Sequence, residues 1–202
     1  KKDLNIKSLK SIKRNFSKFK PDYVLHLAGL SRPMSIHNQK VDLSIDLNII
    51  GTANLVKICY LNNIKLIYLS SSYIYPGNEG NYKEVDPVLP WNNYGWSKLG
   101  GESAVQMYKN SLIIRACMTE KPFIHNFAFS DVKTNFIFHD QMAEILIKII
   151  NKKGIINIGG KSQTIYDFAK KNNKNVKKIK SKGKMPLKIY MNLSKLKKLL
   201  KK

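Results

Sequence analysis

The sequence lacks several features that mark specialised classes of protein. It has only two cysteines, Cys59 and Cys117, too few for a disulfide framework or a four-ligand zinc site. No run approaches the ~18 apolar residues that cross a bilayer, and the lysine-rich start holds no apolar signal segment. The 202 residues are 43% hydrophobic, enough to bury a core. We therefore expect a cytoplasmic globular protein with no membrane segment and no bound metal.

Acidic residues are scarce at both ends, and this accounts for most of the net charge of +23. Residues 1–20 hold eight basic residues and one acid, and residues 170–202 hold fourteen basic residues and no acid. Residues 21–169 are nearly balanced, with fourteen basic and twelve acidic residues. The basic end lacks the interleaved arginines and aromatic residues of base-reading modules, so nucleic acid is not an expected partner. A positive field still favours an anionic substrate.

Apolar segments alternate between strand and helix patterns. In chain order they are residues 3–19 (surface helix), 23–29 (buried strand), 38–61 (helix), 65–69 (strand), 94–108 (helix) and 111–115 (buried strand). This alternation predicts an α/β fold, with a doubly wound parallel sheet that carries helices on both faces. We expect residues 1–115 to form a partial Rossmann-like dinucleotide-binding domain. Residues 116–202 would form a smaller substrate-binding lobe with a basic tail.

Candidate functional residues follow the carboxyl ends of the predicted strands, where an open parallel sheet binds its ligands. They are His26-Leu27-Ala28-Gly29, Ser70-Ser71-Ser72, and the pair Tyr94 and Lys98. A helix places Tyr94 and Lys98 one turn apart on one face. A nearby cation lowers the pKa of a tyrosine, which is ordinarily ~10. With a serine hydroxyl on the same substrate oxygen, this set predicts proton transfer and hydride delivery at a carbonyl.

Several motifs occur in an order that is found in one enzyme family. They are Ala28-Gly29, Asn48-x-x-Gly51-Thr52, Ser70-Ser71-Ser72-x-x-Tyr75 and Tyr94-x-x-x-Lys98. In this order they resemble the extended short-chain dehydrogenases/reductases, the NAD-dependent epimerase/dehydratase family, that act on nucleotide sugars. Tyr82-Lys83-Glu84-Val85-Asp86-Pro87, Ser97-Lys98-Leu99-Gly100-Gly101-Glu102 and residues 162–169 are most similar to the dTDP-4-dehydrorhamnose reductase, or sugar-nucleotide-binding, branch.

The resemblance implies roles for three catalytic residues. Tyr94 would be the general acid, Lys98 would hold the nicotinamide ribose and lower the tyrosine pKa, and Ser71 would be the hydroxyl partner. The residues implied to bind NADP or NAD are Asp3, Leu27, Ala28, Gly29 and Lys98. The implied reaction is reduction of the C4 ketone of a dTDP- or UDP-linked 4-keto-6-deoxyhexose, of the 4-dehydrorhamnose type, in deoxysugar biosynthesis.

Further residues are expected to contact the nucleotide-sugar substrate. They are Ser72, Tyr73, Trp91 and Arg115. Simple loop packing is an equally open role for Trp91, and a surface salt bridge is an equally open role for Arg115. Relatives pair the helices that match residues 38–61 and 94–108, so we also expect a homodimer.

Other functions remain open from the sequence. A nucleotide-sugar 4-epimerase shares the same triad, and the bifunctional 3,5-epimerase/4-reductases share Ala28-Gly29. Dehydration is not expected, because Ser72-Tyr73 stands where a 4,6-dehydratase carries Asp-Glu. The Gly-x-x-Gly-x-x-Gly turn that binds the pyrophosphate in the family is absent, which predicts an N-terminally truncated fragment or a diverged relative. Its absence also favours a candidate of another class, a non-catalytic relative that binds sugar nucleotides.

Overall fold

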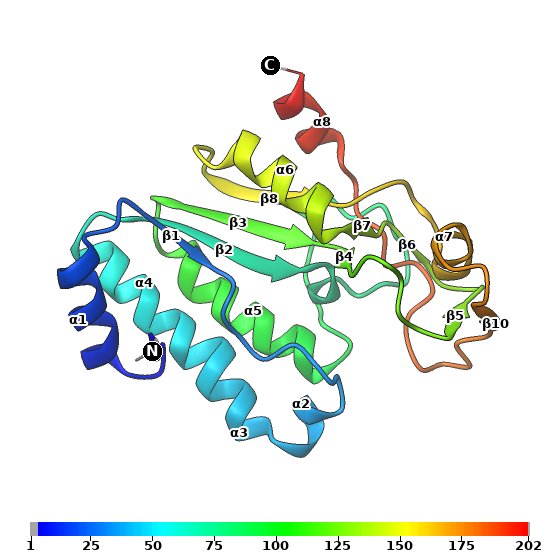
Figure 1. Ribbon diagram of the computed structural model, residues 1–202, viewed down its shortest axis with the longest axis horizontal. Helices are drawn as coiled ribbons and strands as arrows, with labels where there is room; N and C mark the ends of the chain where they lie inside the picture. The colour runs from blue at the N-terminus through cyan, green and yellow to red at the C-terminus, as the bar shows by residue number, and fades with distance from the viewer. Residues whose placement is uncertain (1–3, 202) are drawn as a thin grey trace. The chain divides into compact units, whose positions relative to one another are not determined.

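The computed structural model describes residues 4–201 and shows a mixed α/β fold (Figure 1). Its elements in chain order are α1 (Leu9–Phe19), β1 (Tyr23–His26), α2 (Ile36–Gln39), α3 (Val41–Ser44), the π-helix η1 (Ile45–Ile50), α4 (Gly51–Leu61), β2 (Lys65–Ser71), the 3-10 helix η2 (Ser72–Ile74), α5 (Asn93–Gln106), β3 (Ser111–Ala116), β4 (Met118–Thr119), β5 (Phe127–Phe129), β6 (Lys133–Thr134), β7 (Ile137–Phe138), α6 (His139–Ile149), β8 (Gly154–Ile158), β9 (Gln163–Thr164), α7 (Ile165–Asn172), β10 (Lys177–Ile179) and α8 (Ser194–Leu200). The main sheet has the order β1-β2-β3-β8, and β1 and β2 run parallel. The predicted Rossmann-like fold class is confirmed.

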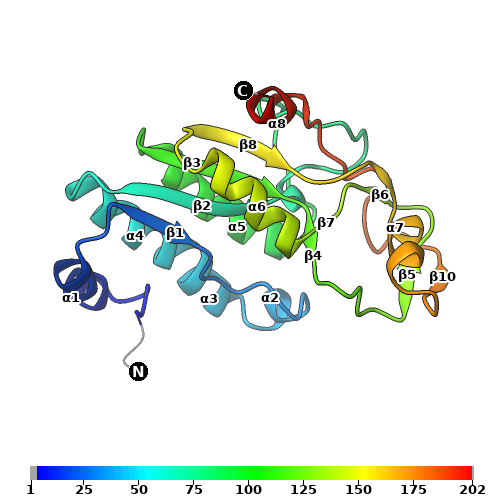
Figure 2. The same cartoon turned by 45° about the horizontal axis from the view of Figure 1, so that its top comes forward.

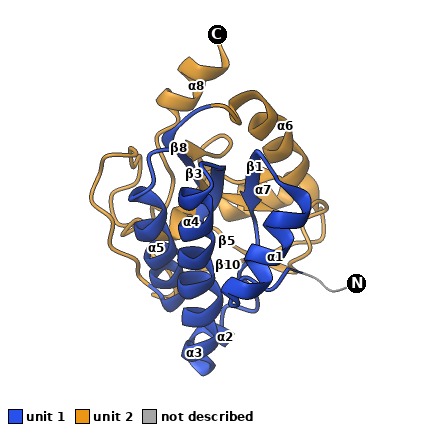
Figure 3. Ribbon diagram, turned by 90° about the vertical axis from the view of Figure 1, so that its left-hand side faces the viewer, with its two compact units in different colours: residues 1–70, 92–114, 152–155 blue, residues 71–91, 115–151, 156–202 orange. Residues whose placement is uncertain are grey.

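The chain divides into two compact units, and each is assembled from three segments (Figure 3). The first unit holds the residues up to 70 together with 92–114 and 152–155. The second holds residues 71–91, 115–151 and the chain from 156 onward. One border, at 114/115, lies one residue from the division expected at 115/116. Strands β2, β3 and β8 each contain a border, because each continues from one unit into the other, whereas the border at 91/92 precedes α5.

In the first unit, α4 and α5 cover one face of the strands (Figures 1 and 2). The core between them is apolar and consists of Cys59, Ile64, Leu66, Tyr68, Val105, Tyr108 and Ile113. A second cluster, Ile6, Ile12, Leu55 and Ile58, packs α1 against α4. Burial of these aliphatic side chains, each worth ~1.5–3 kcal/mol, holds the helices on the sheet.

Helix α1 begins later than the sequence pattern indicates. The apolar spacing predicts a helix from residue 3, whereas the structure starts it at Leu9. The Ser8 side chain accepts a hydrogen bond from the Ser11 backbone N–H at 3.2 Å and caps the helix there. Asp3, the candidate adenine-binding acid, lies outside the described residues.

Strand β1 is not the buried strand that its apolar run predicts. Tyr23, Leu25 and Leu27 are 47%, 43% and 59% exposed. Side chains alternate across a strand, so these three share one face, and Val24 packs on the core from the other. An apolar run alone does not reveal that β1 occupies the end position in the sheet order. The remaining strands of the sequence interpretation, β2 and β3, are buried as expected.

The second unit contains short strand pairs around its own core. β4 pairs with β7 and β5 with β10 in parallel, and β6 pairs antiparallel with β9. The core cluster consists of Phe123, Ala128, Val132, Phe138, Ile165, Phe168, Ala169, Val176 and Ile189. The segment at residues 75–91 runs without a helix or a named strand, as its prolines and glycines predict. Across residues 4–201, no helix is long and apolar enough to cross a membrane.

Candidate functional site

Helix α5 carries the two residues that the sequence places at the centre of the chemistry. Its start is defined by Asn92, whose side-chain oxygen accepts a hydrogen bond from the Gly95 backbone N–H at 2.7 Å. Tyr94 and Lys98 follow one turn apart, and Glu102 comes one turn later. The regular helix therefore arranges a phenol, an ammonium and a carboxylate along one face.

Tyr94 lies half-buried against the segment that contains α2 and α3. Its ring centroid is 5.1 Å from that of His37. His37 is itself buried, and its Nδ1 lies 2.8 Å from the Ser44 hydroxyl oxygen. Burial lowers the pKa of His37, so this imidazole is neutral at physiological pH. The phenol thus lies beside a neutral imidazole, which adds no positive charge to its surroundings.

Lys98 is a buried lysine, with only 8% of its surface exposed. Its Nζ lies 4.3 Å from the centroid of the Tyr68 ring, and the Tyr68 hydroxyl donates to the Lys98 carbonyl at 3.1 Å. Burial lowers the pKa of Lys98 to about 7, and the negative charge of Glu102 opposes that shift. The ammonium therefore titrates near neutral pH, far below the ~10.4 of an exposed lysine.

His26 is buried at the end of β1, and its tautomer follows from its neighbours. Its Nε2 lies 2.8 Å from the Thr52 hydroxyl oxygen, and the Thr52 hydroxyl donates its proton to the Asn48 carbonyl at 2.8 Å. Nε2 must then carry the hydrogen, which leaves Nδ1 as an acceptor without a hydrogen-bond partner among the described residues. Burial, helped by the charge of Lys98, lowers the pKa of His26 to about 3. His26 is neutral and belongs to the packed interior.

Asn48 is a site residue to which the sequence analysis assigned no role. Its side-chain oxygen accepts from the Leu30 backbone N–H at 2.7 Å, and its Nδ2 donates to the Leu30 carbonyl at 2.9 Å and to the Ser97 hydroxyl at 2.8 Å. Asn48 thus ties the segment after β1 to helix α5. It lies in the π-helical turn η1, a distortion that is frequent at functional sites. The Asn-x-x-Gly motif was its only signal in the sequence.

Gly29 permits this approach of Asn48. A Cβ at position 29 would lie 2.7 Å from the Asn48 side-chain oxygen, too close for a side chain to be accommodated there. Leu27, Ala28 and Gly29 are exposed, so their backbone at the carboxyl end of β1 is open to a ligand. The three residues are therefore accessible at this edge of the sheet, and their contact with a cofactor stays a prediction.

The serines at the end of β2 have distinct partners. Ser70 belongs to the first unit, and its hydroxyl donates to Glu102 Oε2 at 2.6 Å. Ser71 belongs to the second unit, where its hydroxyl accepts from the Tyr73 backbone N–H at 3.2 Å and begins η2. Ser72 is buried, and it is one of the polar groups that partly offset the rise in the pKa of the Cys117 thiol that burial causes. Among the three, Ser71 is committed only to a turn at its own strand end, which suits the predicted role of hydroxyl partner.

Tyr73 and Trp91 meet in the second unit. Their ring centroids are 5.2 Å apart with an interplanar angle of 50°. The Trp91 indole nitrogen is buried and has no hydrogen-bond partner among the described residues. A buried indole N–H ordinarily finds an acceptor, so this donor fits a role toward a ligand as well as simple loop packing.

Arg115 has a built-in set of partners in the second unit. It is 3% exposed, and its Nη1 donates to the Tyr75 hydroxyl at 2.8 Å and to the Glu84 carbonyl at 3.0 Å. The Tyr75 hydroxyl in turn donates to the Asn157 side-chain oxygen at 2.9 Å. The guanidinium therefore anchors the segment at residues 75–91. Because Arg115 is buried, it does not form a surface salt bridge, one of the two roles that the sequence left open, and a substrate contact by Arg115 stays a prediction.

The predicted site residues are thus divided between the two units. Those in the first unit are Leu27, Ala28, Gly29, Tyr94 and Lys98, and those in the second are Ser71, Ser72, Tyr73, Trp91 and Arg115. The convergence of Ser71 with Tyr94 and Lys98 over one cavity stays a prediction.

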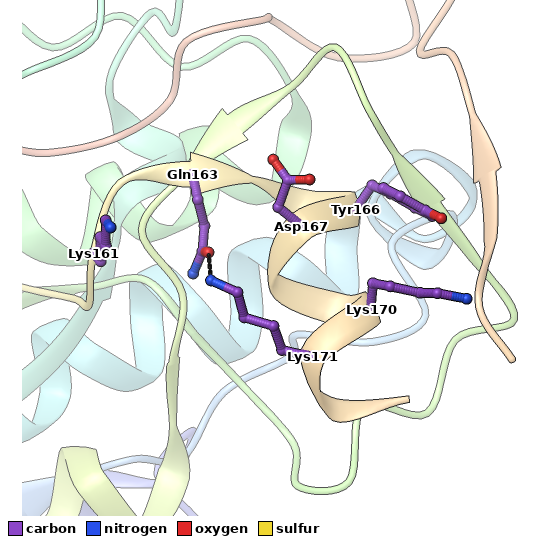
Figure 4. A pocket seen from close by; sticks show the side chains of 6 residues that line it. All are labelled: Lys161, Gln163, Tyr166, Asp167, Lys170 and Lys171. Carbon is purple, nitrogen blue, oxygen red and sulfur yellow. Dashed lines mark hydrogen bonds between the residues drawn. The ribbon is translucent and has the colours of Figure 1, made fainter. Parts of the chain in front are cut away.

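A hollow in the second unit involves none of the predicted residues. It lies around β9 and the start of α7 and is lined by Lys161, Gln163, Tyr166, Asp167, Lys170 and Lys171 (Figure 4). Lys171 Nζ donates to the Gln163 side-chain oxygen at 2.9 Å across it. Within residues 4–201, no group of three or more His, Cys, Asp or Glu side chains could hold a metal ion.

Comparison with known sequences identifies relatives of two kinds. Methionine adenosyltransferase 2 subunit beta of Xenopus laevis is 35% identical over 102 residues, which is 50% of this chain and 30% of that protein. The dTDP-4-dehydrorhamnose reductase of Aggregatibacter actinomycetemcomitans is 27% identical over 113 residues, or 54% of this chain and 37% of that one. The chain therefore spans about a third of the length of these relatives.

Solved structures share the fold over nearly the whole chain. A hypothetical dTDP-4-dehydrorhamnose reductase from Sulfolobus tokodaii matches with a TM-score of 0.85 and 23% identity, covering 97% of this chain and 80% of that one. The dTDP-4-dehydrorhamnose reductase of Bacillus anthracis, solved in complex with NADP, matches with a TM-score of 0.85 and 19% identity, covering 96% and 80%. The model of the RmlD substrate binding domain matches residues 1–130. The chain belongs to the RmlD substrate-binding domain family.

Proposed function

We propose that the protein reduces the C4 ketone of a nucleotide-linked 4-keto-6-deoxyhexose at the expense of NAD(P)H. The observation that carries this proposal is the arrangement on α5, where Tyr94 and the buried Lys98 lie one turn apart. Similarity to dTDP-4-dehydrorhamnose reductases supports the substrate class. A 4-epimerase or a 3,5-epimerase/4-reductase would use the same pair on a related substrate.

The residues present fit a nicotinamide cofactor. Leu27, Ala28 and Gly29 leave an exposed backbone surface at the carboxyl end of β1, the edge at which open sheets bind dinucleotides. Lys98 supplies a buried donor that could reach ribose hydroxyls. When bound, NAD(P)H supplies the hydride. Relatives solved with NADP or NAD support both forms of the cofactor.

The chain's own residues move the proton. Tyr94 would donate its phenolic proton to the ketone oxygen while C4 receives the hydride, so that the C=O group becomes a secondary alcohol. The Lys98 ammonium would stabilise the phenolate that remains. Ser71 would hydrogen-bond the same oxygen and hold the carbonyl in place. Tyr73, Ser72, Trp91 and Arg115 are proposed to border the sugar nucleotide, with Arg115 acting through the segment it anchors.

Removing the phenol tests this proposal most directly. In the full-length protein, Tyr94→Phe should lower kcat at least ~100-fold, the usual worth of general acid catalysis. The measurement is NADH or NADPH oxidation in the presence of a 4-keto-6-deoxyhexose nucleotide. Tyr60→Phe is the matched control, because Tyr60 is an exposed tyrosine on α4. Unchanged turnover by Tyr94→Phe would reject the proposal.

A subunit role without catalysis is the second candidate. It is favoured by the 35% identity to methionine adenosyltransferase 2 subunit beta, which exceeds the 27% identity to the curated reductase. On this alternative, the purified protein would co-elute with another subunit of a methionine adenosyltransferase and would not oxidise NAD(P)H. A reductase would oxidise NAD(P)H and would not co-elute with that subunit.

A homodimer is also proposed. Val41, Ile45 and Ile50 are exposed apolar residues along the helical stretch from α3 to α4, and Trp96 is exposed on α5. Such side chains suit a contact between two copies through these helices. Sedimentation equilibrium of the purified chain would measure the mass and identify a monomer if the contact does not form.

A further inference from the structure

Glu102 is the most deeply buried charged residue of the first unit that the proposed chemistry does not use. It is 0% exposed and lies one turn beyond Lys98 on α5. Tyr94, Lys98 and Glu102 therefore share one helix face at intervals of four residues. Burial of a carboxylate is costly unless it is paired and hydrogen-bonded, so its partners indicate its purpose.

The Glu102 carboxylate is held from two sides. Ser70 at the end of β2 donates to Oε2 at 2.6 Å, and Gln106 on the next turn of α5 donates to Oε1 at 3.3 Å. An O–H···O distance of 2.6 Å is typical of a charge-assisted bond to an ionised carboxylate. These bonds orient a negative charge within the layer between α5 and β2.

A negative charge nearby stabilises the protonated form of Lys98, which burial disfavours. Its other titratable neighbours are the neutral His26 on β1 and Tyr68 on β2, with Tyr94 one turn earlier on α5. The Tyr68 ring provides a cation–π contact but no negative charge. Glu102 is thus the anionic group that the described first unit sets against the buried ammonium.

We propose that Glu102 is a positioning residue, which keeps the Lys98 side chain protonated and aligned with Tyr94 and so sets the pH range in which the tyrosine can act. This inference rests on the proposed reductase function for its catalytic consequence. The state of Lys98 itself can be tested without any activity. The alternative is a purely structural role, in which Glu102 only ties α5 to β2 through Ser70.

The pH dependence of stability reports the state of Lys98. Its folded pKa of about 7 is below the ~10.4 expected in the unfolded chain, so the unfolded state binds more protons between these values. The free energy of unfolding should therefore rise with pH from about 7 upward. Glu102→Gln keeps the side-chain size but removes the charge, and should move the start of this rise at least ~1 pH unit lower.

Three variants complete the experiment. Glu102→Asp retains the charge and should keep the rise within about half a pH unit of its wild-type position. Ser70→Ala breaks the hydrogen bond at Oε2 but retains the carboxylate, so it should lower stability without moving the rise. If Glu102→Gln alone does not fold, the double variant Lys98→Met/Glu102→Gln should fold, because it contains neither buried charge.

Activity provides the second measurement in the full-length protein. The alkaline limb of kcat/KM should move to lower pH in Glu102→Gln by the same ~1 unit, and Glu102→Asp should restore it. The inference is overturned if the free energy of unfolding of Glu102→Gln begins to rise at the same pH as that of the wild type, or if the double variant fails to fold. A wild-type protein without reductase activity would reject the proposed function, while the stability measurement would still decide the role of Glu102.

Discussion

Both units of the molecule bury a basic side chain at a predicted site position, Lys98 in the first and Arg115 in the second, and the surroundings of the two differ. Arg115 in the second unit is 3% exposed and donates to the Tyr75 hydroxyl and the Glu84 carbonyl. Its guanidinium also lies 5.1 Å from the Tyr75 ring. Lys98 in the first unit is 8% exposed and rests on the Tyr68 ring, with Glu102 one turn away.

The difference separates a structural cation from a titratable one. An arginine remains charged at any physiological pH, so a network of acceptors can be built permanently around it. A lysine loses its proton readily when buried, and the pKa of Lys98 is lowered to about 7. A group that titrates near neutral pH beside a tyrosine is suited to acid–base chemistry. The first unit thus contains the adjustable charge and the second contains the permanent one.

Arg115→Leu should produce the largest effect on stability. The substitution leaves the Tyr75 hydroxyl and the Glu84 carbonyl without their donor in a buried setting. Each unsatisfied buried group costs ~1–3 kcal/mol, so the free energy of unfolding should fall by about 3 kcal/mol in urea titrations. Arg14→Leu, at an exposed position of α1, is the control and should change it by less than ~0.5 kcal/mol. If Arg115→Leu and Arg14→Leu lowered the free energy of unfolding equally, Arg115 would not have the structural role described above.

The double variant Lys98→Met/Glu102→Gln should act in the opposite direction. It removes both buried charges and leaves neither without its partner, so it should be about 2 kcal/mol more stable than the wild type at pH 6. The advantage should shrink above pH 7, because the wild type alone gains stability as Lys98 loses its proton. Unfolding should be measured between pH 6 and 9, since burial raises the pKa of Cys59 to about 12 and opposes the trend above pH 9. If the difference in the free energy of unfolding between the variant and the wild type stayed constant from pH 6 to 9, Lys98 would not titrate in this range.

Tyr75→Phe should have the smallest effect of the three. It removes the hydroxyl that accepts from Arg115 and donates to Asn157, while the ring can still stack on Tyr82 at 4.9 Å. The loss should be about 1 kcal/mol, since the Glu84 carbonyl still accepts from the guanidinium. Thermal unfolding checks it, with Tyr60→Phe as the exposed control. If Tyr75→Phe lowered the free energy of unfolding as much as Arg115→Leu does, the stability of the network would depend mainly on the tyrosine hydroxyl.

The local parts of the site could be predicted because they depend on short sequence spacings. The placement of Tyr94 and Lys98 on one helix follows from the 3.6-residue period, and the prolines and glycines at residues 75–91 predict an irregular segment. The partners of Asn48, Glu102 and Arg115 could not be predicted in this way. Their contacts join residues far apart in the sequence, such as Ser70 with Glu102 and Asn48 with Ser97.

The alternation of strands and helices, the helical spacing of the phenol and the ammonium, and the charge imbalance between the ends and the middle can all be read from the amino-acid sequence. These properties are local, because they depend on period and composition. Three other properties follow from the packing of the whole chain: β1 exposes an apolar face, Arg115 is anchored internally, and Lys98 is buried with a pKa near neutrality. Burial and electrostatic environment are created when distant segments pack together, so no single stretch of sequence specifies them.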